Sequence, residues 1–324
     1  MAVPLKIFIA GATGFIGRHL VKAFQAHRHE VYGLAKDSVR GRILETMGCR
    51  PIVGNLLTNG PWEQAIESFD VAIGCTKPGK RGQAPTIAQV PELLKSHTDA
   101  YSHLIHAVHD GKLRGVILTF SVLSYGDHGE EWVDEETPFQ PVGYGRFMGP
   151  ARHALAHLAE SRRVRATFVV PGWVYGNGSW FTEQLLPAVK EGQARIVGTG
   201  GNYMSFVHAE DLAEAYVLAA EAIGYASPAE ERPKQPQLIN LVDDRPIRQQ
   251  EWLSTVCRAL GKPAPGMISV EEATKQAGEL WTESMTCSTR VKNEKATTTL
   301  GWKLQYPTVE EGLPATLAAV GAGK

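Results

Sequence analysis

Three glycines, three positions apart, follow an apolar segment near the beginning of the chain. Residues 5–10 read LKIFIA, the continuous apolar run of a strand buried on both faces, and the next turn, GATGFIG, contains Gly11, Gly14 and Gly17. Without a Cβ, Gly11 can turn tightly, Gly14 admits a pyrophosphate, and Gly17 lets the next helix pack closely. The N–H groups that open this helix would hold the phosphates, so the turn predicts a dinucleotide site.

Strand-like and helix-like segments alternate through the first half of the chain. Continuous apolar runs predict buried parallel strands, and they lie at residues 5–10, 30–35, 49–56, 70–76, 113–121 and 165–176. Amphipathic segments predict helices at residues 15–27, 38–48, 61–69 and 90–112. We therefore predict an α/β fold, a Rossmann-type doubly wound parallel sheet with a small C-terminal substrate lobe.

The predicted fold divides the chain into two parts. Residues 1–176, with parts of 200–245, are expected to form the Rossmann domain that binds the dinucleotide. Residues 177–200 and 245–324 are expected to form the smaller substrate-binding lobe, in which 248–261 and 308–320 have the pattern of helices.

Composition excludes several classes of partner. The net charge is −1 and no run of Lys and Arg marks a nucleic-acid surface. No apolar run reaches the length of a membrane span, and the first strand lacks the basic flank of a signal peptide. The four cysteines are far apart with no CxxC pair, which favours a reduced, cytoplasmic protein without a zinc site. His97, His103, His106 and His109 lie along one predicted helix and are expected to form a partly exposed face, not a metal site.

Further motifs extend along nearly the whole chain. They are FSVLSYG at 120–126, DEETPFQPVGYGRFM at 134–148, VVPGWVYGNG at 169–178, FVHAEDLAEAYVLAAE at 206–221 and STRVKNEKATTTLGW at 288–302. With the glycine turn, this series resembles the extended short-chain dehydrogenase/reductase superfamily, whose members include NAD(P)-dependent epimerases and dehydratases. The resemblance implies a set of cofactor-binding residues, which is Gly11, Thr13, Gly14, Phe15, Ile16, Gly17, Lys36, Arg40, Asn55, Leu56, Cys75, Thr76, Met148, Pro171 and Val174.

The end of the second predicted strand bears on which dinucleotide binds. An NAD site would place an acid there to bind the ribose hydroxyls, but Ala35 occupies the position. Lys36 and Arg40 follow, and two cations favour the 2′-phosphate of NADP(H). Asp37 is the counter-evidence, because a shift by one residue would restore an acid and favour NAD(H). By the resemblance, Asn55 stands where an Asp usually faces the adenine.

The resemblance also assigns catalytic roles and shows one departure from the family pattern. Ser121 would hydrogen-bond a substrate oxygen, and Tyr144 would exchange a proton with it. A Lys normally follows the tyrosine by four positions, and here Met148 stands there. A cation about 4 Å from a phenolate stabilises the phenolate by roughly 4 kcal/mol at an effective dielectric near 20, so its absence makes the tyrosine a poorer base at neutral pH. Its loss favours reduction over alcohol oxidation.

Two nearby residues modify this expectation. Pro150 lacks an N–H, so the helix after Tyr144 is either kinked or begins at Pro150. Lys77, in GCTKPGK at the end of the fourth predicted strand, could supply the cation from another direction.

Several other side chains have both a functional and a structural interpretation. Trp173, Tyr175, Trp180 and Tyr203 either line an aromatic substrate pocket or pack in the core. Asp211 is expected to anchor a helix start, and the charges at Asp127, His128, Glu130 and Glu131 to be mostly solvated. Arg195 and Arg290 leave a sugar diphosphate open as substrate.

We expect an NADP(H)-dependent oxidoreductase that reduces a carbonyl or enone of a small substrate, with Ser121 and Tyr144 at the substrate oxygen. If Trp173 and Trp180 face the cleft, the substrate is apolar or aromatic. Two alternatives stay open, namely a non-redox isomerase, dehydratase or cyclase and a non-catalytic NADP-sensing protein. The resemblance also implies a possible homodimer.

Overall fold

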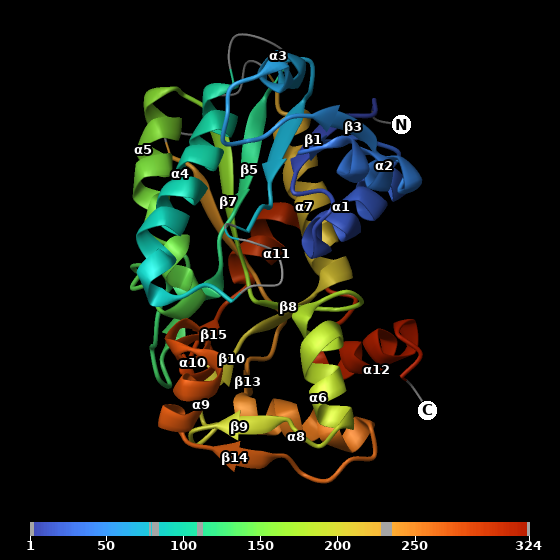
Figure 1. The fold of residues 1–324 in the computed structure, drawn as a ribbon. Helices are drawn as coiled ribbons and strands as arrows, with labels where there is room; N and C mark the ends of the chain where they lie inside the picture. Colours follow the sequence, from blue (N-terminus) through green and yellow to red (C-terminus); the bar gives the residue numbers. More distant parts are fainter. Residues whose placement is uncertain (1–2, 78, 80–83, 109–112, 228–234, 323–324) are drawn as a thin grey trace.

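A seven-stranded parallel sheet forms the centre of the molecule (Figure 1). The computed structural model describes residues 3–77, 79, 84–108, 113–227 and 235–322. The strand order is β12-β7-β5-β4-β1-β2-β3. The strands are β1 (Lys6–Ala10), β2 (Glu30–Ala35), β3 (Arg50–Val53), β4 (Val71–Gly74), β5 (Gly115–Thr119), β7 (Arg165–Pro171) and β12 (Gln237–Leu241). The α/β, Rossmann-type prediction is confirmed.

Helices cover both faces of this sheet because successive side chains of each strand point to opposite sides. On β1, Phe8 belongs to one buried cluster, whereas Ile7 and Ile9 belong to another. The first cluster receives side chains from α3 (Pro61–Ile66), α4 (Val90–His106) and α5 (Ala151–Ser161). The second receives them from α1 (Phe15–Ala26), α2 (Ser38–Thr46), α7 (Ala209–Gly224) and α11 (Glu294–Leu300). Burial on both faces explains the unbroken apolar runs in the sequence.

A third buried cluster lies below the carboxyl ends of the strands (Figure 1). Phe206, Met204 and Trp252 are almost fully buried in it. Its helices are α6 (Leu186–Lys190), α8 (Gln249–Ala259) and α12 (Val309–Ala319), with α9 (Val270–Ala277) and α10 (Glu279–Thr286) beside them.

Short two-stranded sheets lie outside the central sheet. They pair β8 (Trp173–Tyr175) with β11 (Phe206–His208), β6 (Trp132–Val133) with β15 (Arg290–Val291), β10 (Tyr203–Met204) with β13 (Ile247–Arg248), and β9 (Arg195–Val197) with β14 (Gly266–Ile268).

The chain returns to the central sheet late in the sequence, at α7 and β12. Helix α7 packs on the sheet and β12 adds to its edge beside β7. The helices predicted at 248–261 and 308–320 are α8 and α12, whereas α9 and α10 had no prediction. Helix α4 ends at His106, and the rest of its predicted range includes 109–112, outside the described residues. In the described part of the chain, no helix has the length and apolar character needed to cross a membrane.

Candidate functional site

The turn between β1 and α1 has no room for side chains at two of its glycines. Gly11 has a φ of 101°, and a Cβ there would lie 2.7 Å from the carbonyl oxygen of Cys75. A Cβ at Gly17 would lie 2.2 Å from the carbonyl oxygen of Gly11, which already accepts from the Gly14 N–H at 2.8 Å. No side chain caps α1. The first N–H groups of this helix therefore have no capping side chain, as a phosphate site at a helix N-terminus requires.

A pocket of about 220 Å³ opens at this turn, along the carboxyl ends of β1 to β4. Its lining residues are Gly11, Thr13, Leu34, Lys36, Arg40, Gly54, Asn55, Leu56, Leu57, Thr76, Lys77, Gly79, Ser96, His97 and Ala100. The pocket thus brings together seven of the residues predicted to bind the cofactor. The other predicted residues do not line it, namely Gly14, Phe15, Ile16, Gly17, Cys75, Met148, Pro171 and Val174.

The carboxylate of Asp37, beside the pocket, interacts with its own helix. It caps α2 by accepting from the Arg40 N–H at 2.8 Å, and it pairs with the Arg40 guanidinium at 2.9 Å. The backbone hydrogen bond, followed by the guanidinium, lowers the pKa of Asp37. Lys36 and Arg40 line the pocket, and Asp37 does not.

Asn55 and Leu56 form the part of the pocket wall that follows β3. The Asn55 side-chain oxygen accepts from the Leu57 N–H at 3.2 Å, which fixes the amide in the turn. His103 of α4 donates to the Leu56 carbonyl at 2.5 Å. His103 is therefore a structural residue that joins this turn to α4.

His97 corrects the expectation of a partly exposed histidine face. Only 1% of its surface is exposed, and neither ring nitrogen has a hydrogen-bond partner among the described residues. Its ring packs on Tyr101, with the centroids 4.2 Å apart, and burial lowers its pKa to about 4. His97 lies on the apolar face of α4, which is buried against the sheet. The sequence gave no indication that this residue also lines the pocket. His109 lies outside the described residues.

Ser121 and Tyr144 come from separate short segments after β5. Ser121 precedes the 3-10 turn Val122–Ser124 and accepts from the Leu123 N–H at 3.3 Å. Tyr144 is half-buried in the 3-10 helix Gly143–Phe147, and burial raises its pKa. The two side chains do not hydrogen-bond each other in the described structure, which leaves both hydroxyls available for a ligand.

The segment after Tyr144 does not continue as an α-helix. Met148 ends the 3-10 helix with φ −125°, and α5 begins at Ala151 with Pro150 as its N-cap. Helix α5 therefore begins one residue after Pro150. Tyr144 and Met148 do not share an α-helical face, whereas Tyr144 and Phe147, three apart, have ring centroids 5.9 Å apart.

Lys77 reaches Tyr144 from the loop after β4. Its amine lies 4.8 Å from the centre of the Tyr144 ring. The Lys77 side chain as a whole is exposed, yet protein atoms around the amine desolvate it and lower its pKa. A lysine amine therefore lies beside the predicted proton donor although position 148 holds a methionine.

The 3-10 helix that carries Tyr144 is held by α10. The Arg146 guanidinium donates to the Glu283 carboxylate at 2.9 and 2.7 Å, and the Gly143 N–H donates to the same carboxylate at 2.8 Å. The Tyr144 N–H donates to Ser284 at 3.0 Å. Sequence reasoning missed Glu283 and Ser284, because a contact between segments so far apart in the chain leaves no local pattern.

The four aromatic residues lie in different surroundings, and the core interpretation applies to Tyr175. Trp173 and Trp180 contact each other, with ring centroids 5.4 Å apart, whereas Tyr175 is fully buried. Tyr203 lines a second pocket, which shares no residue with the one at the glycine turn. Arg195 and Arg290 lie on the separate strands β9 and β15.

Asp211 has a structural role, as expected, but it is not the residue that caps α7. Its carboxylate accepts from the N–H groups of Gln305 and Tyr306 at 2.7 and 3.0 Å, and the cap of α7 is His208. No cluster of His, Cys, Asp and Glu suited to a metal ion occurs in the part of the chain that the structure describes.

A pocket at the carboxyl end of a doubly wound parallel sheet, beside an uncapped first helix, defines a Rossmann-type dinucleotide-binding protein. The chain belongs to the NAD dependent epimerase/dehydratase family, whose model matches residues 7–228. It is therefore an NAD(P)-dependent protein of the extended short-chain dehydrogenase/reductase type.

Two curated relatives are reductases. The 3-diazoavenalumate denitrifying reductase of a Streptomyces species is 25% identical over 323 residues, which are 95% of this chain and 99% of the relative. The dTDP-4-dehydro-6-deoxy-D-allose reductase of Streptomyces bikiniensis is 25% identical over 244 residues, 68% of this chain and 73% of the relative.

Two solved structures have the same fold. Human epimerase family protein SDR39U1 with NADPH has a TM-score of 0.79 at 19% identity, covering 97% of this chain and 99% of that protein. UDP-glucuronic acid 4-epimerase of Bacillus cereus, in complex with UDP-glucuronic acid and NAD, has a TM-score of 0.75 at 20% identity. The match covers 98% of this chain and 99% of the epimerase.

Proposed function

We propose that this protein is an NADP(H)-dependent reductase that acts on a carbonyl or enone group of a small substrate. Family membership supports a pyridine dinucleotide as cofactor. The observation that carries the choice of NADP(H) is the position of Lys36 and Arg40 in the pocket wall while Asp37 caps α2. A 2′-phosphate would meet two cations, whereas ribose hydroxyls would find no carboxylate among the lining residues.

The residues present fit such a cofactor. The turn from Gly11 to Gly14 and the uncapped N-terminus of α1 would hold the pyrophosphate. Lys36 and Arg40 would pair with the 2′-phosphate, and Asn55 would face the adenine. When bound, the cofactor supplies the hydride.

The protein's own residues would hold the substrate oxygen and supply a proton. Ser121 and Tyr144 donate hydrogen bonds to that oxygen, and Tyr144 gives up its proton as negative charge develops there. Burial raises the pKa of Tyr144, so the hydroxyl is protonated at neutral pH and serves as a donor before it can serve as a base. Lys77 offsets the charge of the resulting phenolate. This protonation state supports reduction over oxidation.

The test measures binding and turnover separately. Titration with NADPH and NADH should give tighter binding of NADPH, and Lys36→Ala should lower NADPH affinity about tenfold with little effect on NADH. A set of ketones and enones should then produce substrate-dependent loss of NADPH absorbance. Equal affinities for both cofactors would refute the choice of NADP(H). Tight NADPH binding without turnover, unchanged in Tyr144→Phe, would instead support a sensing protein. Turnover without net loss of NADPH would support the isomerase, dehydratase or cyclase alternative.

A further inference from the structure

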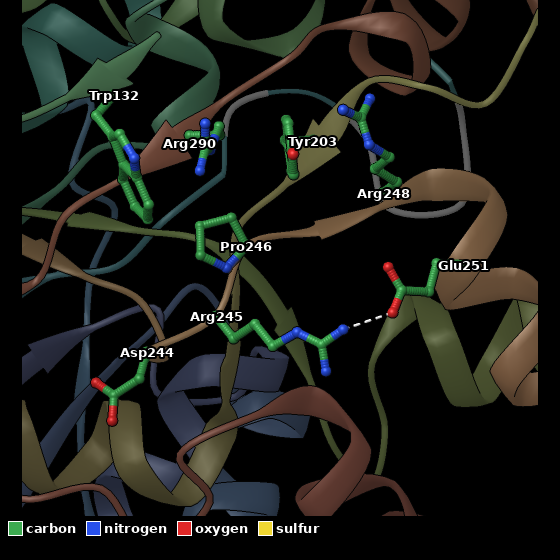
Figure 2. Close-up of a pocket in the computed structure, with 8 residues that line it drawn as sticks. All are labelled: Trp132, Tyr203, Asp244, Arg245, Pro246, Arg248, Glu251 and Arg290. Atoms are coloured by element: carbon green, nitrogen blue, oxygen red, sulfur yellow. Dashed lines mark hydrogen bonds and ion pairs between the residues drawn. The ribbon is translucent and has the colours of Figure 1, made fainter. Parts of the chain in front are cut away.

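A second pocket, of about 310 Å³, lies among short strands outside the central sheet (Figure 2). Its lining residues are Trp132, Tyr203, Asp244, Arg245, Pro246, Arg248, Glu251 and Arg290. They come from the short strands β6, β10, β13 and β15, from α8 and from the loop after the edge strand β12. The cofactor pocket follows β1 to β4, and the two linings share no residue. Ser121, Tyr144 and Lys77 do not line this second pocket either.

Rings and guanidinium groups alternate along one wall of this pocket. The Arg290 guanidinium lies 4.4 Å from the Trp132 ring centre and 4.6 Å from that of Tyr203. The Arg248 guanidinium lies 4.4 Å from the Tyr203 ring centre. The order is therefore Trp132, Arg290, Tyr203, Arg248, in which each cation contacts an aromatic face. Because Arg290 lies between two rings, the direction of its N–H edge is fixed before any ligand arrives.

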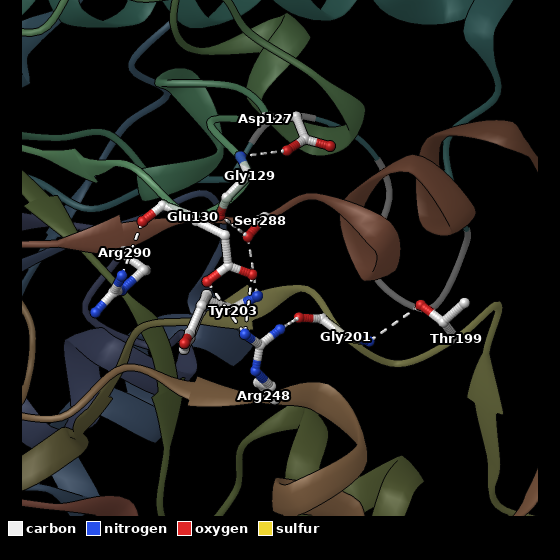
Figure 3. A network of polar contacts seen from close by, with 9 residues as sticks. All are labelled: Asp127, Gly129, Glu130, Thr199, Gly201, Tyr203, Arg248, Ser288 and Arg290. Carbon is white, nitrogen blue, oxygen red and sulfur yellow. Dashed lines mark hydrogen bonds and ion pairs between the residues drawn. The ribbon is translucent and has the colours of Figure 1, made fainter.

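Of the three arginines in the wall, two are neutralised by carboxylates. Arg248 pairs with Glu130 at 2.9 Å (Figure 3), and Arg245 pairs with Glu251 at 2.5 Å and with Glu310 at 2.8 Å. Arg290 instead donates to the backbone carbonyl of Glu130 at 2.8 Å. Within the described residues no carboxylate forms an ion pair with Arg290, and its buried Nε has no hydrogen-bond partner.

An apolar surface stands next to this uncompensated cation. Trp132 is 45% exposed, and Pro246 lines the pocket near it (Figure 2). A large exposed aromatic ring in a concavity beside a positively charged group is the composition of a ligand site for a flat anion. Two acids also line the pocket, and one of them, Glu251, is already paired with an arginine of the wall. The Asp244 carboxylate disfavours any anion near it, so we expect a ligand with one negative charge, placed at Arg290.

We propose that this pocket binds a small aromatic monocarboxylate. The carboxylate pairs with Arg290, and the ring packs against Trp132 and Pro246. The volume of the pocket is at the lower end of the range for small-molecule sites, which suits a ligand with one ring. The site is separate from the cofactor pocket, so the ligand binds to the protein with or without NADPH.

The probe is benzoate, and benzamide and acetate are the comparators. Binding of each compound to the full chain is measured by ligand-observed saturation-transfer NMR. Benzoate should bind with a dissociation constant of about 1 mM. Benzamide, which lacks the carboxylate, and acetate, which lacks the ring, should bind at least about tenfold more weakly. Affinity should fall as salt is added, since an ion pair is screened. Saturating NADPH should not displace benzoate.

Variants locate the binding. Trp132→Ala and Arg290→Gln should each weaken benzoate binding at least about tenfold, whereas Tyr225→Ala, which removes an exposed aromatic ring on another surface, should leave it unchanged. Trp132 is an exposed position, so this variant remains informative if Arg290→Gln fails to fold. Displacement by NADPH, equal binding of benzamide, or full binding by both pocket variants would overturn the proposal.

Discussion

The amine of Lys77 lies 4.8 Å from the centre of the Tyr144 ring, although the two residues come from loops after different strands. Lys77 follows β4, and Tyr144 lies in the 3-10 helix between β6 and β7. The parallel sheet brings both loops to its carboxyl edge. Lys77 thus places a cation beside Tyr144 from a direction other than position 148, and a cation over the ring would favour the phenolate form of the hydroxyl on it.

Removal of this cation should slow the reaction. We expect Lys77→Met to lower kcat about tenfold to a hundredfold, equal to about 1.4–2.7 kcal/mol of activation free energy. The loss is smaller than the roughly 4 kcal/mol of a close pair because the exposed Lys77 side chain is screened by water. The pH profile of kcat should also shift to higher pH, because the Tyr144 phenolate loses its cation.

The matched control is Lys95→Met on α4, where an exposed lysine pairs with Asp99 one turn along the helix. This variant should retain wild-type kcat. Unchanged kcat in Lys77→Met, or an equal loss in both variants, would show that the Lys77–Tyr144 contact has no part in turnover.

The choice of cofactor can be tested at Asp37 without disturbing α2. Asp37→Ser keeps an N-cap side chain but removes the carboxylate that pairs with Arg40. The freed guanidinium should bind the 2′-phosphate more strongly, so NADPH affinity should rise severalfold while the melting temperature and NADH affinity stay the same. Calorimetric titration with both cofactors measures this ratio. If NADH affinity falls instead, Asp37 is the acid that binds the ribose and the proposed preference is wrong.

The central strands of the sheet were predictable because the burial of a strand determines which residue types occur along that strand itself. The strands at the centre of the sheet are buried on both faces, and such a strand has to be an apolar run, as in IFIA at 7–10. The glycine turn was predictable from its spacing, although only part of its cause is local: a Cβ at Gly17 would meet the Gly11 carbonyl in the same loop, whereas a Cβ at Gly11 would meet Cys75 after β4. Edge strand β12 was less evident, because QLINL follows a turn-rich segment and pairs only with β7.

The cofactor pocket was partly predictable, and the contacts across it were not. Lys36 follows β2 directly and Arg40 lies in the first turn of α2, so their place at the carboxyl edge could be inferred. His97 shares the helical spacing of the buried residues Leu93, Ala100 and Leu104, which is a signal for burial, but nothing in the sequence shows that it borders a pocket. Glu283 and Tyr144 come together only through the tertiary fold.

The Glu283 carboxylate should stabilise the Tyr144 segment in a pH-dependent way. Arg146 lowers the pKa of Glu283, so this contribution is complete above the unfolded carboxyl pKa of about 4.3 and is lost as pH falls through the lower folded pKa. We expect Glu283→Gln to lower the free energy of unfolding by about 1 kcal/mol at neutral pH. Urea titrations at several pH values should show the difference shrinking in acid.

A control for this ion pair is Glu271→Gln in α9, where an exposed glutamate pairs with Lys275. Exposed pairs of this spacing contribute little, about 0.3–0.5 kcal/mol, so stability should hardly change. Because Glu283 also positions the backbone beside Tyr144, Glu283→Gln should lower kcat as well, and Glu271→Gln should not. Equal stability of wild type and Glu283→Gln at neutral pH would contradict the role of this contact.

His97 should make the cofactor-free protein sensitive to acid. Burial lowers its folded pKa to about 4, below the unfolded value of about 6.5, so the unfolded chain binds a proton first as pH falls. Stability is therefore lost between these two pKa values, up to about 3 kcal/mol in total. His97→Phe fits among the Tyr101 and Phe120 rings and removes two buried nitrogens without partners. This variant should be as stable as wild type at neutral pH and more stable at pH near 4.

The same variant tests whether a ligand satisfies the imidazole. His97 lines the cofactor pocket, so a bound dinucleotide can supply the hydrogen bond that its ring lacks in the described structure. NADPH should then raise the melting temperature of wild type more than that of His97→Phe, because stabilisation by a ligand follows its affinity. His97→Asn, which keeps a polar group, should restore part of the NADPH effect. Equal NADPH-induced shifts in all three proteins would mean that the imidazole nitrogens face away from the cofactor and that His97 is only a core residue.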